Sequence, residues 1–173
     1  MVIRQEEAKD HNAVYSLVKR AFETAERADG NEQDLVSALR QSEAYIPALS
    51  LVAEIDGRLA GHILFTKAEA GGSTVLALAP LSVLPDYQRQ GVGTALIREG
   101  HRIARALGYG WSVVLGSAAY YSRLGYRPAD TFGIQAPFEV PRENFMACKL
   151  LPGAPAIHGT VRYAKEFGIE GEG

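Results

Sequence analysis

The stretch from Thr74 to Leu84 is apolar at almost every position, and it limits the folds open to this chain. An apolar run of this length between turn residues, with Gly71-Gly72 before it and Pro85 after it, predicts a strand. A strand that is apolar on both faces needs cover on both faces, as the central strands of α/β sheets have. Pro80 is the exception within the run, because proline cannot donate to the ladder and belongs at an edge or a bulge.

The patterns on either side supply this cover. Asp56-Gly57 joins the apolar runs 49–55 and 59–68, which is the turn signal of a β-hairpin. Amphipathic helices are predicted over 14–22, 32–40 and 91–107. In the second of these, Arg40 is expected to point outward. On the third, the stripe expected to face the sheet consists of Val92, Leu96, Gly100, Ile103 and Leu107. The opposite face, expected in solvent, carries Arg98, His101, Arg102 and Arg105.

This order of elements describes one α/β domain over residues 1–173, a mixed sheet with helices on both faces. The length of 173 residues is enough for one substantial core, and 47% hydrophobic with 22% charged residues is typical of globular proteins. A net charge of -2 argues against a nucleic-acid partner. The single cysteine, Cys148, fits a reducing compartment. The start lacks a signal peptide, and no apolar run approaches the ~20 residues that cross a bilayer, so we expect a cytoplasmic protein without a membrane partner.

The segment Val83–Thr94 joins the apolar strand to the helix that follows it. A helix start carries unpaired N–H groups and a partial positive charge, so it suits a bound phosphate. Gly91 and Gly93 would let a pyrophosphate approach the backbone, and Arg89 adds positive charge. A Walker loop would need Gly-Lys-Ser/Thr here, and a dinucleotide fingerprint would need a small residue in place of Leu96. Taken alone, the two glycines favour a plain strand–helix turn over a phosphate site.

The hexapeptide Gln88-Arg89-Gln90-Gly91-Val92-Gly93 resembles the Arg/Gln-x-x-Gly-x-Gly/Ala signature of the GNAT-type N-acetyltransferase superfamily. The preceding run Leu81–Pro85 is similar to the fourth strand of that family. The segment Ala119–Tyr126 is similar to its second signature, an aromatic-rich helix that ends in Gly-Phe/Tyr. The two motifs, found together in this order, identify the family more specifically than either motif alone. The resemblance spans roughly Val2 to Leu150 and is strongest to the bacterial YhbS-like branch.

This resemblance implies a GNAT-like sheet, mixed and mostly antiparallel, with helices on both faces and a splayed pair of central strands. A bulge in the fourth strand of that fold would accommodate Pro80. The resemblance also implies acetyl-CoA as acyl-donor cosubstrate, and no residue grouping has metal-ligand spacing. The expected contacts with acetyl-CoA are Leu81, Ser82, Val83, Gln88, Arg89, Gln90, Gly91, Val92, Gly93, Thr94 and Arg123. Arg123 fits a solvated helix charge equally well.

Acyl transfer from a thioester to an amine needs a neutral amine, a stabilised oxyanion and a proton for the leaving thiolate. The resemblance makes Tyr121 the general acid. In the alternative, Tyr121 packs beneath the cofactor, and Tyr120 or neither tyrosine reaches the sulfur. A backbone N–H of Leu81 or Ser82 is the expected oxyanion donor. The candidates for the base are Glu32, Glu54, His62 and Glu69.

Three of the four base candidates have a structural alternative. His62 lies in an apolar run and fits a hydrogen-bonded core residue, and Glu54 fits a solvent-facing strand position. Glu32 fits the first turn of a helix, where a carboxylate is favoured. A bound water is a further acceptor for the proton of the amine. The sequence therefore assigns no base.

The predicted activity is transfer of an acetyl group from acetyl-CoA to a primary amine, directly and without an acyl-enzyme. The alternative is a non-catalytic acyl-CoA-binding regulatory module of the same fold. A ribosome-directed or toxin–antitoxin acetyltransferase is disfavoured because an acidic chain lacks a basic face. The early helices and the segment from Pro128 to Tyr163 would select the acceptor, which the sequence does not identify. Many relatives form homodimers, and no sequence feature decides the oligomeric state.

Overall fold

The computed structural model describes residues 1–23 and 29–169. These residues form two compact units. The first unit contains Met1–Phe65 and Ala79–Gly100, and the second contains Thr66–Leu78 and the chain from His101 onward. Three elements belong to both units: β3 (Arg58–Ala70), β4 (Ser73–Val83) and α3 (Val92–Ala106). None of the helices within the described residues is long and apolar enough to span a bilayer.

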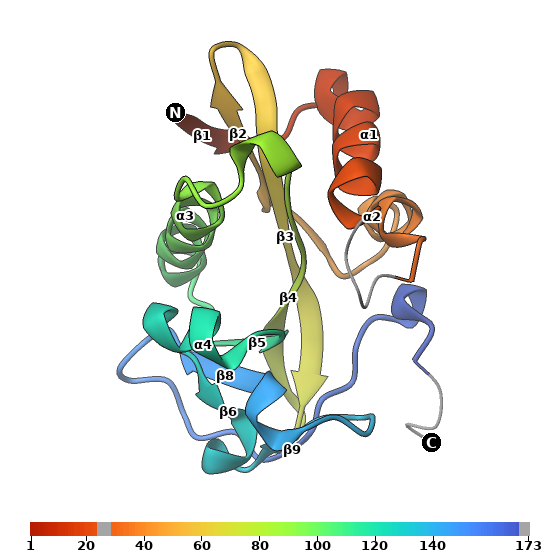
Figure 1. The fold of residues 1–173 in the computed structure, drawn as a ribbon. Coiled ribbons are helices and arrows are strands. Elements are labelled where there is room, and N and C mark those ends of the chain that lie inside the picture. The colour runs from red at the N-terminus through yellow and green to blue at the C-terminus, as the bar shows by residue number, and fades with distance from the viewer. Residues whose placement is uncertain (24–28, 170–173) are drawn as a thin grey trace. The chain divides into compact units, whose positions relative to one another are not determined.

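Within the described residues, seven strands are hydrogen-bonded in the order β1-β2-β3-β4-β5-β8-β6 (Figure 1). The β1–β2, β5–β8 and β6–β8 pairs are antiparallel and the β4–β5 pair is parallel, which confirms the predicted mixed, mostly antiparallel sheet. The β4–β5 register contains only Leu76↔Ser112 and Ala77↔Val113, as expected for strands that diverge. A separate parallel pair consists of β7 and β9. The remaining strand bounds are β1 (Val2–Gln5), β2 (Tyr45–Ile55), β5 (Trp111–Leu115), β6 (Arg127–Pro128), β7 (Ile134–Gln135), β8 (Phe145–Lys149) and β9 (Gly159–Thr160).

The predicted hairpin is confirmed. β2 and β3 are joined by Asp56 and Gly57, whose φ values of 52° and 76° are both positive. A two-residue turn with positive φ at both positions matches the right-handed twist of the flanking strands. Pro80 lies inside β4 and follows a cis peptide bond.

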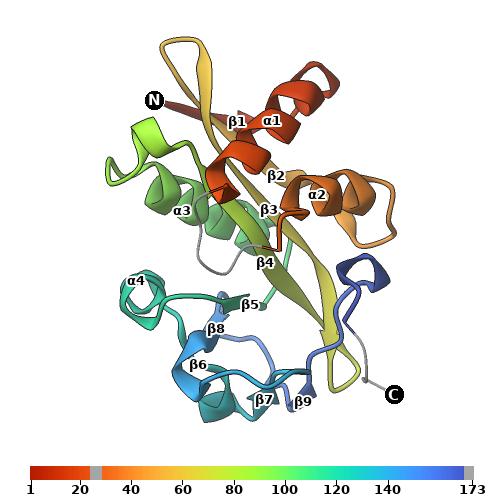
Figure 2. The same ribbon diagram turned by 45° about the vertical axis from the view of Figure 1, so that its right-hand side comes forward.

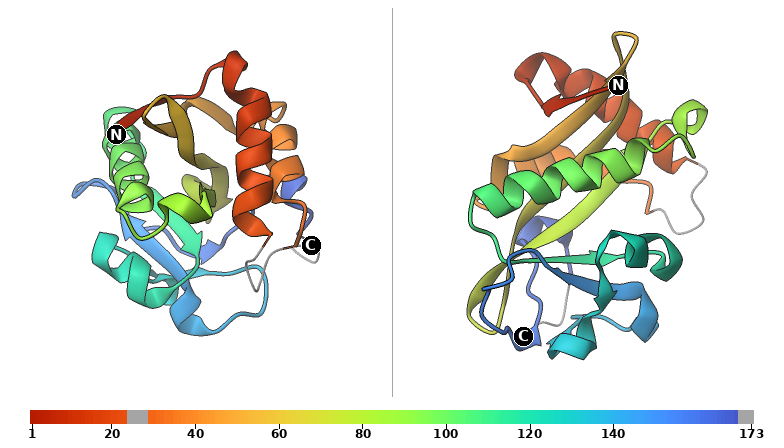
Figure 3. Two further views of the ribbon diagram at one scale, coloured as in Figure 1. Left: turned by 45° about the horizontal axis from the view of Figure 1, so that its top comes forward. Right: turned by 90° about the vertical axis from the view of Figure 1, so that its left-hand side faces the viewer.

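In the first unit, helices cover both faces of the strands. α1 (His11–Phe22) and α2 (Glu32–Arg40) lie on one side of β2 and β3, and α3 lies on the other (Figures 1 and 3). Gly61 of β3 lets α3 approach closely, because a Cβ there would lie 2.9 Å from Val92 and 3.0 Å from Leu96. The core residues of α1 and α2 are Val14, Leu17, Val18, Val36 and Leu39.

In the second unit, the strands β5, β8 and β6 follow one another (Figure 2). Their core includes Trp111, Val113, Phe145 and Ala147. α4 (Ala118–Tyr121) follows β5. Short 3₁₀ helices complete the two units: η1 (Ala8–Asp10), η2 (Pro85–Tyr87), η3 (Ser122–Leu124), η4 (Ala129–Phe132), η5 (Arg142–Asn144) and η6 (Lys165–Phe167).

Three predicted orientations are wrong. Leu107 is 50% exposed because α3 ends at Ala106, so Leu107 leaves the apolar stripe. His101, expected in solvent, is buried and hydrogen-bonded to the hydroxyl of Tyr126. Arg40, expected to point outward, pairs with the buried carboxylate of Glu6.

Candidate functional site

The first part of the candidate site is the loop between β4 and α3 in the first unit. After Val83 the chain makes the 3₁₀ turn η2 and then enters Gln88–Gly91, whose residues are exposed. The side-chain amide of Gln88 donates to the Val83 carbonyl at 3.2 Å, and that of Gln90 donates to the Asp86 carbonyl at 2.9 Å. These two bonds fix the loop and leave its outer surface open.

Gly91 starts α3, since its carbonyl accepts the N–H of Ala95 at 3.0 Å. Its φ of +85° is unfavourable for any side chain, and a Cβ there would meet nothing within 4 Å. The N–H groups of Val92 and Gly93 lie in the first helical turn, where no intrahelical acceptor exists. Arg89 is exposed, and no residue of the described chain pairs with its side chain. The helix start is therefore open, positively polarised and able to bind a phosphate.

The end of β4 leads into this loop and carries the predicted pantetheine contacts. Leu81 and Val83 are half-buried, whereas Ser82 is only 1% exposed. The Ser82 hydroxyl has no hydrogen-bond partner among the described residues. The N–H of Leu84, just after the strand, donates to the Ala60 carbonyl at 2.9 Å. β4 therefore stays attached to β3 at this end.

The second part of the candidate site is α4, in the second unit. Ser117 caps this helix by accepting the N–H of Tyr120 at 3.2 Å. Tyr121 is 8% exposed, and its ring covers Gly116, where a Cβ would lie 2.5 Å from the ring. Gly125 ends the following turn with a φ of +91°. The predicted short helix and its stop are confirmed.

Tyr121 has the protonation state that a general acid requires. Burial, and then the neighbouring Tyr120, raise its pKa well above the ordinary value of 10.0. Its ring contacts that of Tyr126 edge to face, with centroids 5.5 Å apart. The Tyr126 hydroxyl is bonded to Ser112 at 2.8 Å and to His101 at 2.9 Å. The phenol of Tyr121 therefore stays protonated on a rigid support, and its hydroxyl can donate a hydrogen bond. Arg123 is exposed.

The three glutamate candidates for the base have structural partners. Glu32 accepts the backbone N–H groups of Asp29 and Gly30 at 2.8 and 3.1 Å, so it supports the turn before α2. Glu54 pairs with Arg4 at 2.6 Å. Glu69 of the second unit pairs with Arg162, from the tail of the chain.

Arg4 also binds Asp10 through two bonds of 2.8 and 2.9 Å. This contact with Arg4 lowers the pKa of Asp10 to about 2. Each glutamate candidate thus already has a hydrogen-bond or ion-pair partner. The assignment of Glu32 or Glu54 as base stays a prediction that these contacts do not favour.

The fourth candidate, His62, lies at the centre of a buried polar cluster that the sequence did not reveal. Its Nε2 lies 3.1 Å from the Ser50 hydroxyl, which donates to Glu6 at 2.9 Å. Arg40 binds the same carboxylate at 2.5 and 3.0 Å. Arg40 and Ser50 lie 34 and 44 positions from Glu6 in the sequence. No local sequence pattern indicates contacts between residues so far apart.

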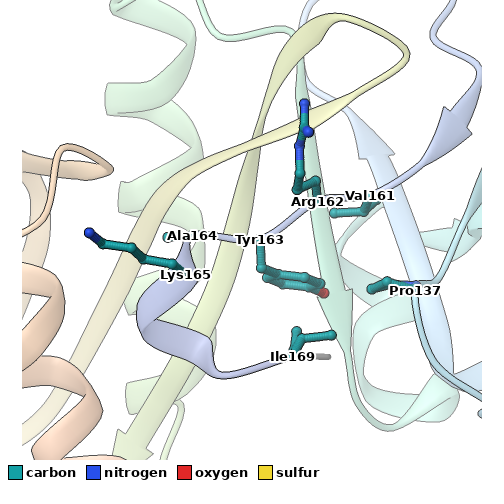
Figure 4. Close-up of a pocket in the computed structure, with 7 residues that line it drawn as sticks. All are labelled: Pro137, Val161, Arg162, Tyr163, Ala164, Lys165 and Ile169. Carbon is teal, nitrogen blue, oxygen red and sulfur yellow. The ribbon is translucent and has the colours of Figure 1, made fainter. Parts of the chain in front are cut away.

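Described residues of the second unit line a larger and a smaller cavity. The larger has a volume of about 540 Å³ and is lined mainly by small and apolar side chains, among them Trp111 and Ile157. The smaller, about 20 Å³, surrounds the ring of Tyr163, whose hydroxyl end lies near Pro137 and Ile169 (Figure 4). It has room for about one water molecule. Burial raises the pKa of Tyr163 well above the ordinary value. Among residues 1–23 and 29–169, no group of three or more His, Cys, Asp or Glu side chains is placed to hold a metal ion.

Comparisons with known proteins identify the family of the chain. The profile of the Acetyltransferase (GNAT) family matches residues 11–126, which include both parts of the candidate site. The N-acetyltransferase YjhQ of Escherichia coli, whose function is uncharacterised, is 42% identical over 142 residues, 79% of this chain and 78% of its own length. The likewise uncharacterised N-acetyltransferase YhbS of Escherichia coli is 30% identical over 171 residues, 96% of this chain and 98% of its own.

Solved structures show the same fold. YhbS from Escherichia coli, crystallised in complex with CoA, has a TM-score of 0.85 at 29% identity and covers 98% of this chain and 93% of its own. A GNAT family acetyltransferase from Brucella melitensis, in complex with acetyl-CoA, has a TM-score of 0.80 at 33% identity and covers 96% of this chain and 97% of its own. The family profile covers more than half of the chain and the similar sequences and structures agree with it, so the chain belongs to the Acetyltransferase (GNAT) family.

Proposed function

We propose that the chain is one acyltransferase domain over residues 1–173, which moves an acetyl group from acetyl-CoA to a primary amine by direct transfer. The observation that carries this proposal is the open start of α3, where Gly91 has positive φ and no neighbour where a Cβ would stand. The CoA and acetyl-CoA bound by the two solved relatives support the same ligand here. A phosphate fits this helix start because its N–H groups and dipole favour an anion.

The chemical step requires two proton transfers. The amine nitrogen bonds to the acetyl carbon and loses a proton, while the carbon–sulfur bond breaks. The Tyr121 hydroxyl, which is protonated at neutral pH, then gives its proton to the leaving thiolate and regains one from solvent. The backbone N–H of Leu81 or Ser82 would stabilise the oxyanion.

Calorimetric titration with acetyl-CoA tests the binding site. Gly91→Glu places a carboxylate beside the phosphates and should abolish binding. Gly57→Glu is the matched control, since Gly57 also has positive φ, +76°, and open space around it, but lies in the β2–β3 turn. Wild type and control should bind equally. Absence of binding in the wild type, or equal loss in both variants, would refute the proposed phosphate site.

Turnover distinguishes an enzyme from a non-catalytic acyl-CoA-binding module. CoA release should be followed with a polyamine, an aminoglycoside, lysine and a peptide N-terminus as acceptors. With the acceptor that reacts best, Tyr121→Phe should lower kcat by at least about 100-fold, the usual contribution of an acid–base group. Its dissociation constant for acetyl-CoA should stay within about twofold, because the ring that packs on Gly116 is retained. Equal turnover in wild type and variant would remove Tyr121 from the mechanism.

A further inference from the structure

In the buried cluster around His62, the donor and the acceptor of each hydrogen bond can be assigned. Glu6 and His62 have fully buried side chains, and that of Arg40 is 9% exposed. Burial raises the pKa of Glu6, but the Arg40 bond, the nearby His62 and the Ser50 bond outweigh it and hold that pKa below the ordinary value. Glu6 is therefore an ionised carboxylate that only accepts hydrogen bonds.

The protonation of the imidazole follows from these bonds. The Ser50 hydroxyl has one hydrogen, which it donates to Glu6, so its oxygen must accept from Nε2 of His62. Burial lowers the pKa of His62 to about 4, which leaves the ring neutral at pH 7. A neutral ring with its hydrogen on Nε2 carries a lone pair on Nδ1. His62 is thus held as a proton acceptor at Nδ1.

Nδ1 has no partner among the described residues, and neither does the hydroxyl of Ser82. The bond from Leu84 N–H to the Ala60 carbonyl sets the local register of β3 and β4. His62 lies two residues after Ala60 and Ser82 two residues before Leu84. In the antiparallel hairpin of β3 and β4 this register sets them opposite each other on the same face of the sheet. A buried acceptor and a buried donor without partners, side by side, mark a place for an internal water.

We propose that His62 Nδ1 and the Ser82 hydroxyl bind one internal water, and that His62 takes up the proton of the attacking amine through it. This role rests on the proposed acetyl transfer. As the nitrogen–carbon bond forms, the amine gives a proton to the water, and the water gives one of its own to Nδ1. His62 becomes an imidazolium, which later loses the proton to solvent. Ser50 and Glu6 are the positioning residues that keep Nδ1 unprotonated beforehand.

The charged and titratable groups around His62 are compatible with its transient protonation. The Glu6 carboxylate lies 3.9 Å from Nε2 and would stabilise the imidazolium. The positive charge of Arg40 disfavours the imidazolium, but the Glu6 carboxylate, to which Arg40 makes two hydrogen bonds, offsets this charge. Tyr45 also donates to Glu6, at 3.4 Å, and burial, the first of several causes, raises its pKa, so it stays neutral. The imidazolium can form transiently but does not persist.

Nitrogen NMR of the histidine rings in the protein at pH 7 tests the resting state without any substrate. His62→Gln assigns the His62 signals by their loss. We expect a protonated Nε2 and an unprotonated Nδ1. A hydrogen on Nδ1, or an imidazolium at pH 7, would overturn the proposal whether or not the protein proves to be an enzyme.

Kinetics with the best amine acceptor test the proton transfer. His62→Gln keeps a donor toward Ser50 but loses the Nδ1 lone pair, so kcat should fall at least about 100-fold. The dissociation constant for acetyl-CoA should stay within about twofold of the wild-type value. Without the Nδ1 acceptor, the proton of the amine must pass to hydroxide, so log kcat of the variant should rise with pH with a slope of about +1. The wild-type kcat should instead stay constant from about pH 6 to 8. A purely structural role for His62 would not create this slope.

Two smaller substitutions keep the test decisive if His62→Gln folds poorly. Ser82→Ala removes only the donor to the water and should lower kcat about tenfold, the scale of one hydrogen bond. Thr66→Val is the matched control, because Thr66 also has a buried hydroxyl without a partner among the described residues, and its kcat should match that of the wild type. Unchanged kcat in His62→Gln or Ser82→Ala would overturn the relay. No turnover in the wild type would instead refute the proposed function, and the NMR result would still decide the state of His62.

Discussion

Two buried histidines should make the folded protein sensitive to mild acid. His62 is 0% and His101 is 4% exposed. Burial lowers the pKa of each from 6.5 to about 4, with Arg105 adding to the effect at His101. Between these values the unfolded chain binds protons at both histidines, whereas the folded chain does not. Stability falls wherever the unfolded state binds more protons, so it should fall as the pH drops from 7 to 5.

The size of this loss follows from the two pKa values. With 6.5 in the unfolded state and about 4 in the folded state, each histidine lowers the free energy of unfolding by about 2 kcal/mol between pH 7 and pH 5. Together they remove about 4 kcal/mol, a large share of the roughly 5–15 kcal/mol that holds a domain folded. The carboxylates Glu6 and Asp10 have lowered pKa values and titrate at lower pH, so they add little in this range.

Urea unfolding at pH 7 and pH 5, followed by the fluorescence of the single tryptophan, Trp111, measures the loss. His101→Gln should reduce it from about 4 to about 2 kcal/mol because one titrating group is removed. His11→Gln is the control, since His11 is exposed and should leave the loss unchanged. A wild-type loss below about 1 kcal/mol, or an undiminished loss in His101→Gln, would refute the reasoning.

Two substitutions in the first unit test its packing by urea unfolding. Arg40→Met leaves the Glu6 carboxylate buried without its partner and should cost about 3–5 kcal/mol, of which a second change, Glu6→Gln, should recover part. If Arg40→Met has the same urea midpoint as the wild type, the Arg40–Glu6 ion pair does not stabilise the fold. Gly100→Ala would place a Cβ against the ring of Phe65 and should cost about 1–3 kcal/mol. Gly153→Ala, with open space around it, should change stability by less than about 0.5 kcal/mol, and equal effects at both glycines would contradict the packing described.

The parts of the fold that could be predicted from sequence depend on neighbours along the chain. Asp56-Gly57 forms its turn because two adjacent residues with positive φ are all that the turn requires. The start of α3 at Gly91 and the stop at Gly125 are likewise local. The expected identity of the family followed from such short motifs and is confirmed by the profile match over residues 11–126.

The buried polar contacts could not be predicted, because helical periodicity sorts residues by polarity and not by partner. Arg40 and His101 lie on the polar sides of their helical patterns, so both were placed in solvent. Each is buried because a residue far along the chain, Glu6 for one and Tyr126 for the other, offers a hydrogen bond. The general base was undecided from sequence for the same reason, since the surroundings of His62 come from three separate segments.

The division of the chain between its two units has a consequence for synthesis on the ribosome. The first unit needs residues 79–100 as well as 1–65, and the hairpin between them belongs to the second unit. The nascent N-terminal segment therefore cannot complete its core when residue 65 emerges. The face of β3 that packs on α3 at Gly61 stays exposed until α3 has been made, at roughly 5–20 residues per second. During that interval the emerging chain is a natural client for chaperones that bind extended apolar segments.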